Sequence, residues 1–196
     1  MQHELALTQI KEKDGSQAHQ CGRLRVTQGE MDAMTLENGE QNRVCHLLSA
    51  MPGDTVSLDW LAGAHREQLL LCDALEEIAD SLPASVNRQK CIYAAMVLGP
   101  LIHGLHRYEE EVLFPHLTAR TKGNALLAET LKRLKFEHCE DECFAEELVD
   151  TLLKLGSGAP DVNIEAAGYM LRGFFETIRR HIAFERDHLL RGLHDA

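Results

Sequence analysis

Several absences narrow the class of protein. No apolar run approaches the roughly 18 residues of a transmembrane helix, and the opening residues, MQHELALTQIKEKDG, contain no apolar signal-peptide core. We therefore expect a soluble, cytoplasmic protein with no membrane partner. Basic residues are few, with 20 Lys and Arg against 31 Asp and Glu and a net charge of −11. This balance argues against binding to nucleic acid or to an anionic membrane surface.

Paired cysteines and strand patterns are missing as well. The six cysteines form no Cys-x-x-Cys pair, so we expect reduced thiols of a cytosolic protein. No segment shows the alternating pattern of a strand. With 44% apolar residues in 196, the chain has enough apolar side chains for one core, in one domain or in one domain plus an extension.

The composition changes near residue 55. Residues 1–42 are polar and contain several glycines without a sustained period, so we expect them to be disordered or loosely attached. A short amphipathic helix is possible near 43–51, where apolar residues recur at i, i+3, i+4 and i+7 before Pro52 and Gly53. The predicted domains are therefore an N-terminal extension, 1–55, and a helical domain, 56–196.

Four long amphipathic helices are predicted in the second domain. Their apolar periodicity and capping residues give the ranges 57–81, 86–119, 124–155 and 162–192. Short loops make consecutive helices antiparallel neighbours. The expected fold is all-α, an up-down-up-down antiparallel four-helix bundle with an N-terminal extension.

Each predicted helix carries one histidine on its apolar stripe. These four residues are separated by 41, 32 and 43 positions along the chain, and they are His65, His106, His138 and His181. Counting down one helix and up the next, at about 1.5 Å of rise per residue, leaves mismatches of only about 6, 1.5 and 3 Å. All four histidines should therefore lie at nearly one level of the bundle.

Carboxylates accompany two of these histidines. Glu110 follows His106 by four residues and Glu185 follows His181 by four, a spacing that places each pair on one helix face. Such groups are costly to bury unless they are neutralised or coordinated. A pair of divalent metal ions would do both, and mixed imidazole and carboxylate donors suit iron or manganese better than structural zinc.

At these positions the chain resembles the hemerythrin-like family, also called the HHE cation-binding domain. The resemblance covers about residues 57–192 and rests on four segments in order: AHREQ, HRYEEEVLFP, EHCEDE and HIAFERDHLL. It implies a four-helix bundle around a non-haem di-iron centre. Members of such a family bind or react with oxygen or nitric oxide, or report iron and oxygen.

The resemblance also implies a ligand set for two iron ions, in which both glutamates bridge the irons: His65, His106, Glu110, His138, His181 and Glu185. This set is most similar to the His-Glu variant of bacterial proteins that repair iron–sulfur centres, although their N-terminal cysteine domain is not recognisable here. One alternative concerns the second helix. The family has two residues between Glu-Glu and Leu-Phe-Pro, whereas here only Val112 intervenes. Alignment on Leu-Phe-Pro selects Glu109 instead of the preferred Glu110.

Five nearby residues receive lesser roles. His103 is interpreted as a solvated or supporting residue, and Asp141 as a hydrogen-bond acceptor behind a ligand. Cys139 and Cys143 are expected to be buried, inert thiols, with redox sensing as the alternative. Tyr108 is expected at a seam between helices.

Three functions are compatible with this site. The preferred one is a protein that binds or senses a small diatomic ligand, oxygen or nitric oxide, or iron status. The second is an enzyme that reduces peroxide or nitric oxide, or delivers iron for iron–sulfur repair. The third is a module that binds a protein partner through residues 1–55 according to its iron state.

Overall fold

The computed structural model describes residues 42–121 and 123–190, and within them all regular structure is helical. After a short helix at 42–49, the elements are α2 (Leu58–Ser81), α3 (Arg88–Tyr108), η1 (Glu109–Leu113), α4 (Phe114–Thr121), α5 (Ala125–Ser157), α6 (Ile164–Phe184) and η2 (Glu185–Leu190). The two η elements are π-helical, with a wider turn than an α-helix.

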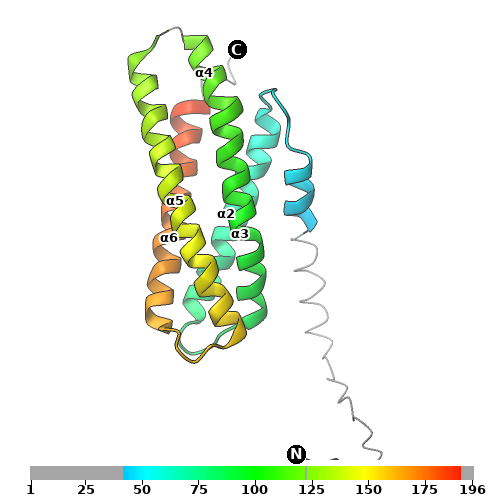
Figure 1. Ribbon diagram of the computed structural model, residues 1–196, viewed down its shortest axis with the longest axis vertical. Helices are drawn as coiled ribbons and strands as arrows, with labels where there is room; N and C mark the ends of the chain where they lie inside the picture. The colour runs from blue at the N-terminus through cyan, green and yellow to red at the C-terminus, as the bar shows by residue number, and fades with distance from the viewer. Residues whose placement is uncertain (1–41, 122, 191–196) are drawn as a thin grey trace, which may run out of the picture.

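These elements form four antiparallel rods. One rod is α2, the second joins α3, η1 and α4, the third is α5, and the fourth joins α6 and η2 (Figure 1). Around the bundle, α2 packs against α3 and α6, and α5 packs against the same two helices. The predicted all-α bundle is confirmed.

Side-chain caps define where the helices begin. Ser57, Asn87, Asn124 and Asn163 each accept a hydrogen bond from the backbone N–H three residues later, which satisfies one of the free donors of a first turn. At its other end, α5 stops at Gly158, whose φ of 72° is a left-handed conformation that glycine adopts without strain. These caps set the points at which the rods begin and at which α5 ends.

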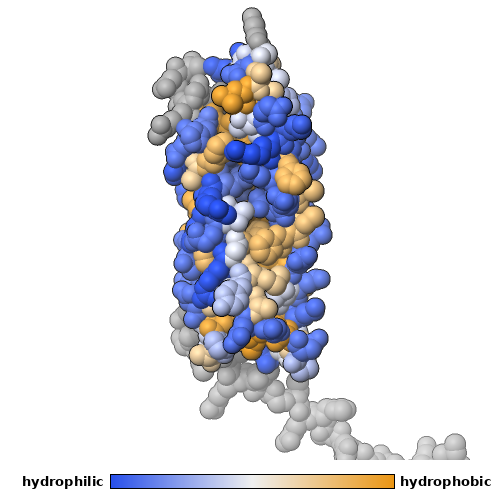
Figure 2. Space-filling view, turned by 90° about the vertical axis from the view of Figure 1, so that its left-hand side faces the viewer, coloured by the Kyte–Doolittle hydropathy of each residue, from blue (hydrophilic) through white to orange (hydrophobic). Residues whose placement is uncertain are grey.

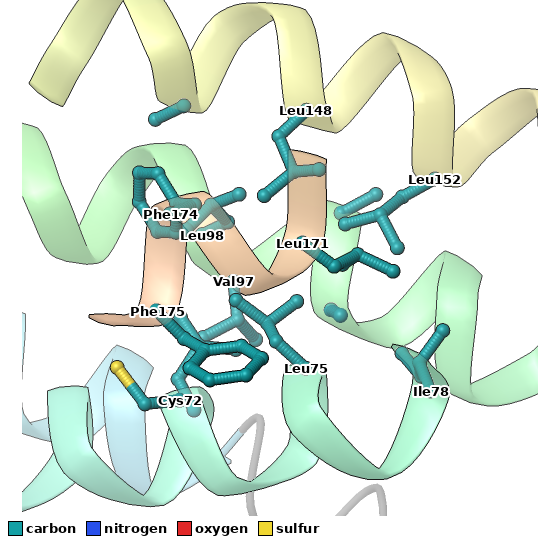
Figure 3. Packing of buried hydrophobic residues seen from close by; sticks show 14 of the residues in the cluster. Cys72, Leu75, Ile78, Val97, Leu98, Leu148, Leu152, Leu171, Phe174 and Phe175 are labelled. Atoms are coloured by element: carbon teal, nitrogen blue, oxygen red, sulfur yellow. The ribbon is translucent and has the colours of Figure 1, made fainter. Parts of the chain in front are cut away.

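The interior contains two apolar clusters. We call the first the Leu148 cluster; helices α2, α3, α5 and α6 all contribute to it, and Figure 3 shows its interlocking side chains, among them Cys72, Leu75, Leu98, Leu148, Leu171 and Phe174. The second, the Trp60 cluster, lies toward the other end of the rods and includes Trp60, Leu61, Leu105, Tyr108, Phe114, Leu134 and Leu189.

The helix at 42–49 packs on the outside of α2 and α3. Val44 is buried, and the indole Nε1 of Trp60 donates a hydrogen bond to the Leu47 carbonyl at 3.0 Å. A Cβ added to Gly104 would lie 2.7 Å from Leu48 Cδ2, so the glycine permits this close approach. The helix occupies the region where the sequence suggested one. Of residues 1–42, which we expected to be disordered or loosely attached, 1–41 lie outside the described residues.

One face of the bundle carries both hydrophilic and apolar side chains. On the face shown in Figure 2, apolar side chains lie between blue, hydrophilic groups. None of the described helices combines the length and the hydropathy that crossing a membrane would require.

Candidate metal centre

A layer of buried polar side chains separates the two apolar clusters. Its members come from all four rods, and each is less than a tenth exposed: His65, His106, Glu109, His138, Asp141, His181 and Glu185. The four histidines that helical rise placed at one level are therefore brought together inside the bundle.

The imidazole rings lie close to one another. His106 and His138 stack with ring centroids 4.0 Å apart and planes inclined by 4°. The His181 ring lies 5.0 Å from that of His138. Nitrogen atoms of these three side chains lie within 4.8 Å of one another, close enough to share a metal ion.

Two carboxylates connect the fourth histidine to this group. His65 Nε2 lies 3.4 Å from Glu109 Oε1 and 3.3 Å from Glu185 Oε2. The other oxygen of Glu109 lies 3.4 Å from His138 Nε2, and the other oxygen of Glu185 lies 3.6 Å from His181 Nε2. Each carboxylate therefore lies between His65 and one further histidine, as a bridging ligand would.

The structure places Glu109, and not the preferred Glu110, in this layer. Glu109 is 1% exposed, whereas the Glu110 side chain is 32% exposed and ion-pairs with Lys135. Glu109 lies seven residues after the buried Ile102, close to two full helical turns, and therefore continues the inward stripe. Glu110 is rotated by about a further 100° away from it. The alignment on Leu-Phe-Pro had pointed to this register.

Both inward carboxylates stand at the start of a π-helical turn. Glu109 opens η1, where the Phe114 N–H bonds the Glu109 carbonyl five residues back, and Glu185 opens η2. Turns of this kind are rare and are often found at functional sites. They occur on two different rods, directly at the two buried carboxylates. This coincidence indicates that the layer is a functional site.

Carboxylates also lie at hydrogen-bond distance behind two of the histidines. His106 Nδ1 is 3.1 Å from Glu142 Oε1, and His138 Nδ1 is 2.9 Å from Glu110 Oε1. These contacts hold the rings so that Nε2 of His138 is directed into the layer, and such support is typical of metal-binding histidines. Sequence reasoning did not identify Glu142 for this role, because it lies on a different rod from His106.

Asp141 and His103, for which we predicted supporting roles, both lie beside the layer's histidines. Asp141 is buried, but its Oδ2 lies 3.8 Å from His181 Nδ1, too far for a hydrogen bond. His103 is 44% exposed and lies 3.3 Å from Glu142 Oε2, on the outer side of the layer.

Of the remaining predictions, the position of Tyr108 agrees with the structure and the burial of the two cysteines does not. Tyr108 is buried between rods, where its ring contacts Trp60 at a centroid distance of 4.5 Å. The burial expected for Cys139 and Cys143 is wrong, because both are exposed. His138 takes the inward position on α5, and neighbouring residues on a helix point about 100° away.

Five atoms of the layer are buried without any hydrogen-bond partner: Glu109 Oε2, His138 Nε2, Asp141 Oδ2, His181 Nε2 and Glu185 Oε1. Leaving such atoms unpaired costs free energy. Four of these residues, Glu109, His138, His181 and Glu185, each bring a ligand atom within 4.8 Å of the others, and nitrogen and carboxylate oxygen together are the donor set that iron or manganese accepts. The residues present therefore fit a metal centre.

Burial and mutual contact shift the pKa values of several side chains in the layer. Burial and the neighbouring Glu185 raise the pKa of Glu109 to about 8. Burial opposes the charge on His65, but its contacts with Glu109 and Glu185 outweigh burial and raise its pKa to about 9. Burial also disfavours an ionised Glu185, yet the close contacts with His181 and His65 hold its pKa below the usual range. Burial and the nearby imidazoles lower the pKa of His106 to about 2.

The family model of the hemerythrin HHE cation binding domain matches residues 56–193. Because the match spans most of the chain, the protein belongs to this family, as the sequence resemblance indicated. The fold and the histidine and glutamate cluster accordingly define a helical cation-binding domain. No curated protein and no solved structure matches the chain.

Proposed function

We propose that this protein is a non-haem di-iron protein that binds or senses oxygen or nitric oxide. The ligands would be His65, His106, Glu109, His138, His181 and Glu185. The observation that carries the proposal is the convergence of four unpaired, buried donor atoms in a domain of a cation-binding family. Bound iron would supply the redox-active centre at which a diatomic ligand is held.

The number of donors supports a ligand-binding role. Four imidazole nitrogens and four carboxylate oxygens do not fill the coordination shells of two octahedral ions. Positions therefore remain open to an exogenous ligand. The chain's own residues fix the donor geometry from four rods, and the two apolar clusters on either side exclude bulk water from it.

Metal analysis and optical spectroscopy of the natively purified protein test this proposal. We expect two irons per chain, and an optical change when the reduced protein meets oxygen or nitric oxide that reverses on removal of the gas. Stoichiometric zinc without iron would refute the di-iron assignment. Repeated turnover of peroxide or nitric oxide with a reductant would move the protein to the enzyme class.

A further inference from the structure

His65 differs from the other three histidines of the layer. A carboxylate lies within 4 Å of Nδ1 in His106, His138 and His181. For His65 Nδ1, no residue in the described ranges 42–121 and 123–190 supplies a hydrogen-bond partner. The side chain is only 8% exposed, and the exposed part faces a groove.

The groove lies between α2 and the rod formed by α6 and η2. It has a volume of about 580 Å³, and its apolar wall consists of Leu58, Leu69, Ile182 and Leu190. Sites for small organic molecules have volumes of about 300–1,000 Å³. The groove is therefore larger than a diatomic gas requires, and it has the apolar wall of an organic-ligand site.

Two arginines give the groove a local positive charge. Arg66 and Arg186 line it and are exposed. Arg186 contacts its neighbour Asp187, which also lines the groove, whereas Arg66 forms no ion pair with a described residue. Although the chain has a net charge of −11, two guanidinium groups against one carboxylate leave this groove locally positive, and a positive charge beside an apolar wall favours an anion with an apolar body.

We propose that this groove binds an amphipathic organic anion, of the class of a medium-chain carboxylate. The carboxylate contacts Arg66 and Arg186 and supplies the acceptor that His65 Nδ1 lacks, while the alkyl chain packs along the leucines and Ile182. His65 also contacts Glu109 and Glu185, so an occupant of the groove touches a residue of the proposed metal centre. Binding itself rests on the groove and its charges and does not depend on which metal is held.

Calorimetric titration of the full-length, natively purified protein with octanoate tests the proposal, with 1-octanol and octylammonium as matched probes. We expect saturable binding of one octanoate per chain, and affinities lower by about tenfold or more for the neutral and cationic probes, because each loses a charge-assisted contact. Metal content measured on the same samples separates a failure of this proposal from a failure of the di-iron assignment.

Substitutions localise the binding. Arg66→Gln combined with Arg186→Gln should weaken octanoate binding by about tenfold or more, and Ala62→Trp should abolish it by filling the groove that Ala62 lines. The matched control is Arg180→Gln, an exposed arginine of α6 outside the groove, which should leave the affinity unchanged. Circular dichroism checks that each variant is folded.

Three results would overturn the proposal. One is the absence of saturable heat at millimolar octanoate, and another is equal affinity for octanoate and 1-octanol. The third is unchanged binding in folded Ala62→Trp or in the double arginine variant.

Discussion

The Leu148 cluster and the polar layer are built from the same rods, yet their energetics are opposite. The cluster consists of leucine, alanine, phenylalanine and other apolar side chains that interlock without polar groups (Figure 3). Burying each large side chain of this kind stabilises the fold by about 1.5–3 kcal/mol. The polar layer holds four histidines and three carboxylates, and several of its atoms have no partner.

The apolar cluster and the polar layer therefore have different tasks, because the first stabilises the fold and the second holds the candidate metal site. The apolar cluster fixes the helix register and needs nothing from outside the chain. Burying the polar layer lowers the free energy of unfolding when no metal is bound, and a bound metal ion would offset this loss by satisfying the buried donor atoms. Substitutions in the two regions should therefore affect different properties.

The largest effect on stability is expected in the apolar cluster. Leu148→Ala should lower the free energy of unfolding by about 2–5 kcal/mol, because Leu148 is fully buried and its truncation leaves a cavity. Leu153→Ala on the same helix, where the leucine is 43% exposed, is the control and should cost much less. Urea denaturation measures both.

Metal content at saturating iron should be unchanged in folded Leu148→Ala. Loss of metal from this variant, but not from Leu153→Ala, would show that the cluster and the polar layer are not separable.

A run of three glutamates offers the second test, in the polar layer. Glu109→Gln should cause the largest loss of metal, because Glu109 lies between His65 and His138. Glu110→Gln should lower metal affinity by about 10–100-fold through the loss of support to His138 Nδ1. Glu111→Gln is the control, since that side chain is 69% exposed on the outer surface.

Metal titrations of the three variants give the ranking directly. A larger loss from Glu110→Gln than from Glu109→Gln would restore Glu110 as the ligand.

The level of the histidines was predictable because helical rise is nearly constant and the loops are short. Counting residues through the predicted turns was enough to place His65, His106, His138 and His181 together. The rotation of each rod about its own axis, which decides the side chains that face each other across two rods, does not follow from residue counting. Glu142 faces His106 from α5, and no spacing within a single helix contains that contact.

The choice between Glu109 and Glu110 shows a second limit. Residues three and four positions after His106 both lie on its side of a helix, so spacing alone does not separate them. In the structure, Glu109 continues the buried stripe through Ile102 and opens a π-helical turn, whereas Glu110 lies at the edge of the layer. Likewise, the groove beside His65 depends on contact between α2 and α6, which are far apart in sequence.

The third prediction concerns protons in the polar layer. With pKa values of about 8 for Glu109 and about 9 for His65, both side chains carry a proton at neutral pH before metal binds. Metal must displace these protons, so affinity should rise with pH by about tenfold per unit for each proton displaced. The rise should extend from about pH 6.5 to 8 and level off above 9.

Metal titration in weakly buffered solution measures the released protons alongside the affinity. Glu185, whose pKa is held low, should contribute none. Affinity that is constant between pH 6.5 and 8 would show that the metal-free ligands are already deprotonated there.

The smallest effect is expected at the edge of the polar layer, in the Trp60 cluster. The Tyr108 hydroxyl accepts a hydrogen bond from the Ser57 backbone N–H at 2.7 Å. The same hydroxyl donates a longer hydrogen bond to the Thr55 carbonyl at 3.4 Å. Tyr108→Phe should therefore lower the free energy of unfolding by about 1–2 kcal/mol, because it removes both hydrogen bonds. Metal content should stay constant, because Tyr108 points away from Glu109 by about 100° of helix rotation.

The matched control is Tyr169→Phe, which removes the same hydroxyl from a side chain that is 77% exposed and should leave stability unchanged. Thermal melts and metal analysis of the two variants, side by side, separate the outcomes. If Tyr108→Phe lost metal while Tyr169→Phe did not, the polar layer would extend into the Trp60 cluster. The boundary between the stabilising and the metal-binding regions would then lie one turn nearer the end of the bundle.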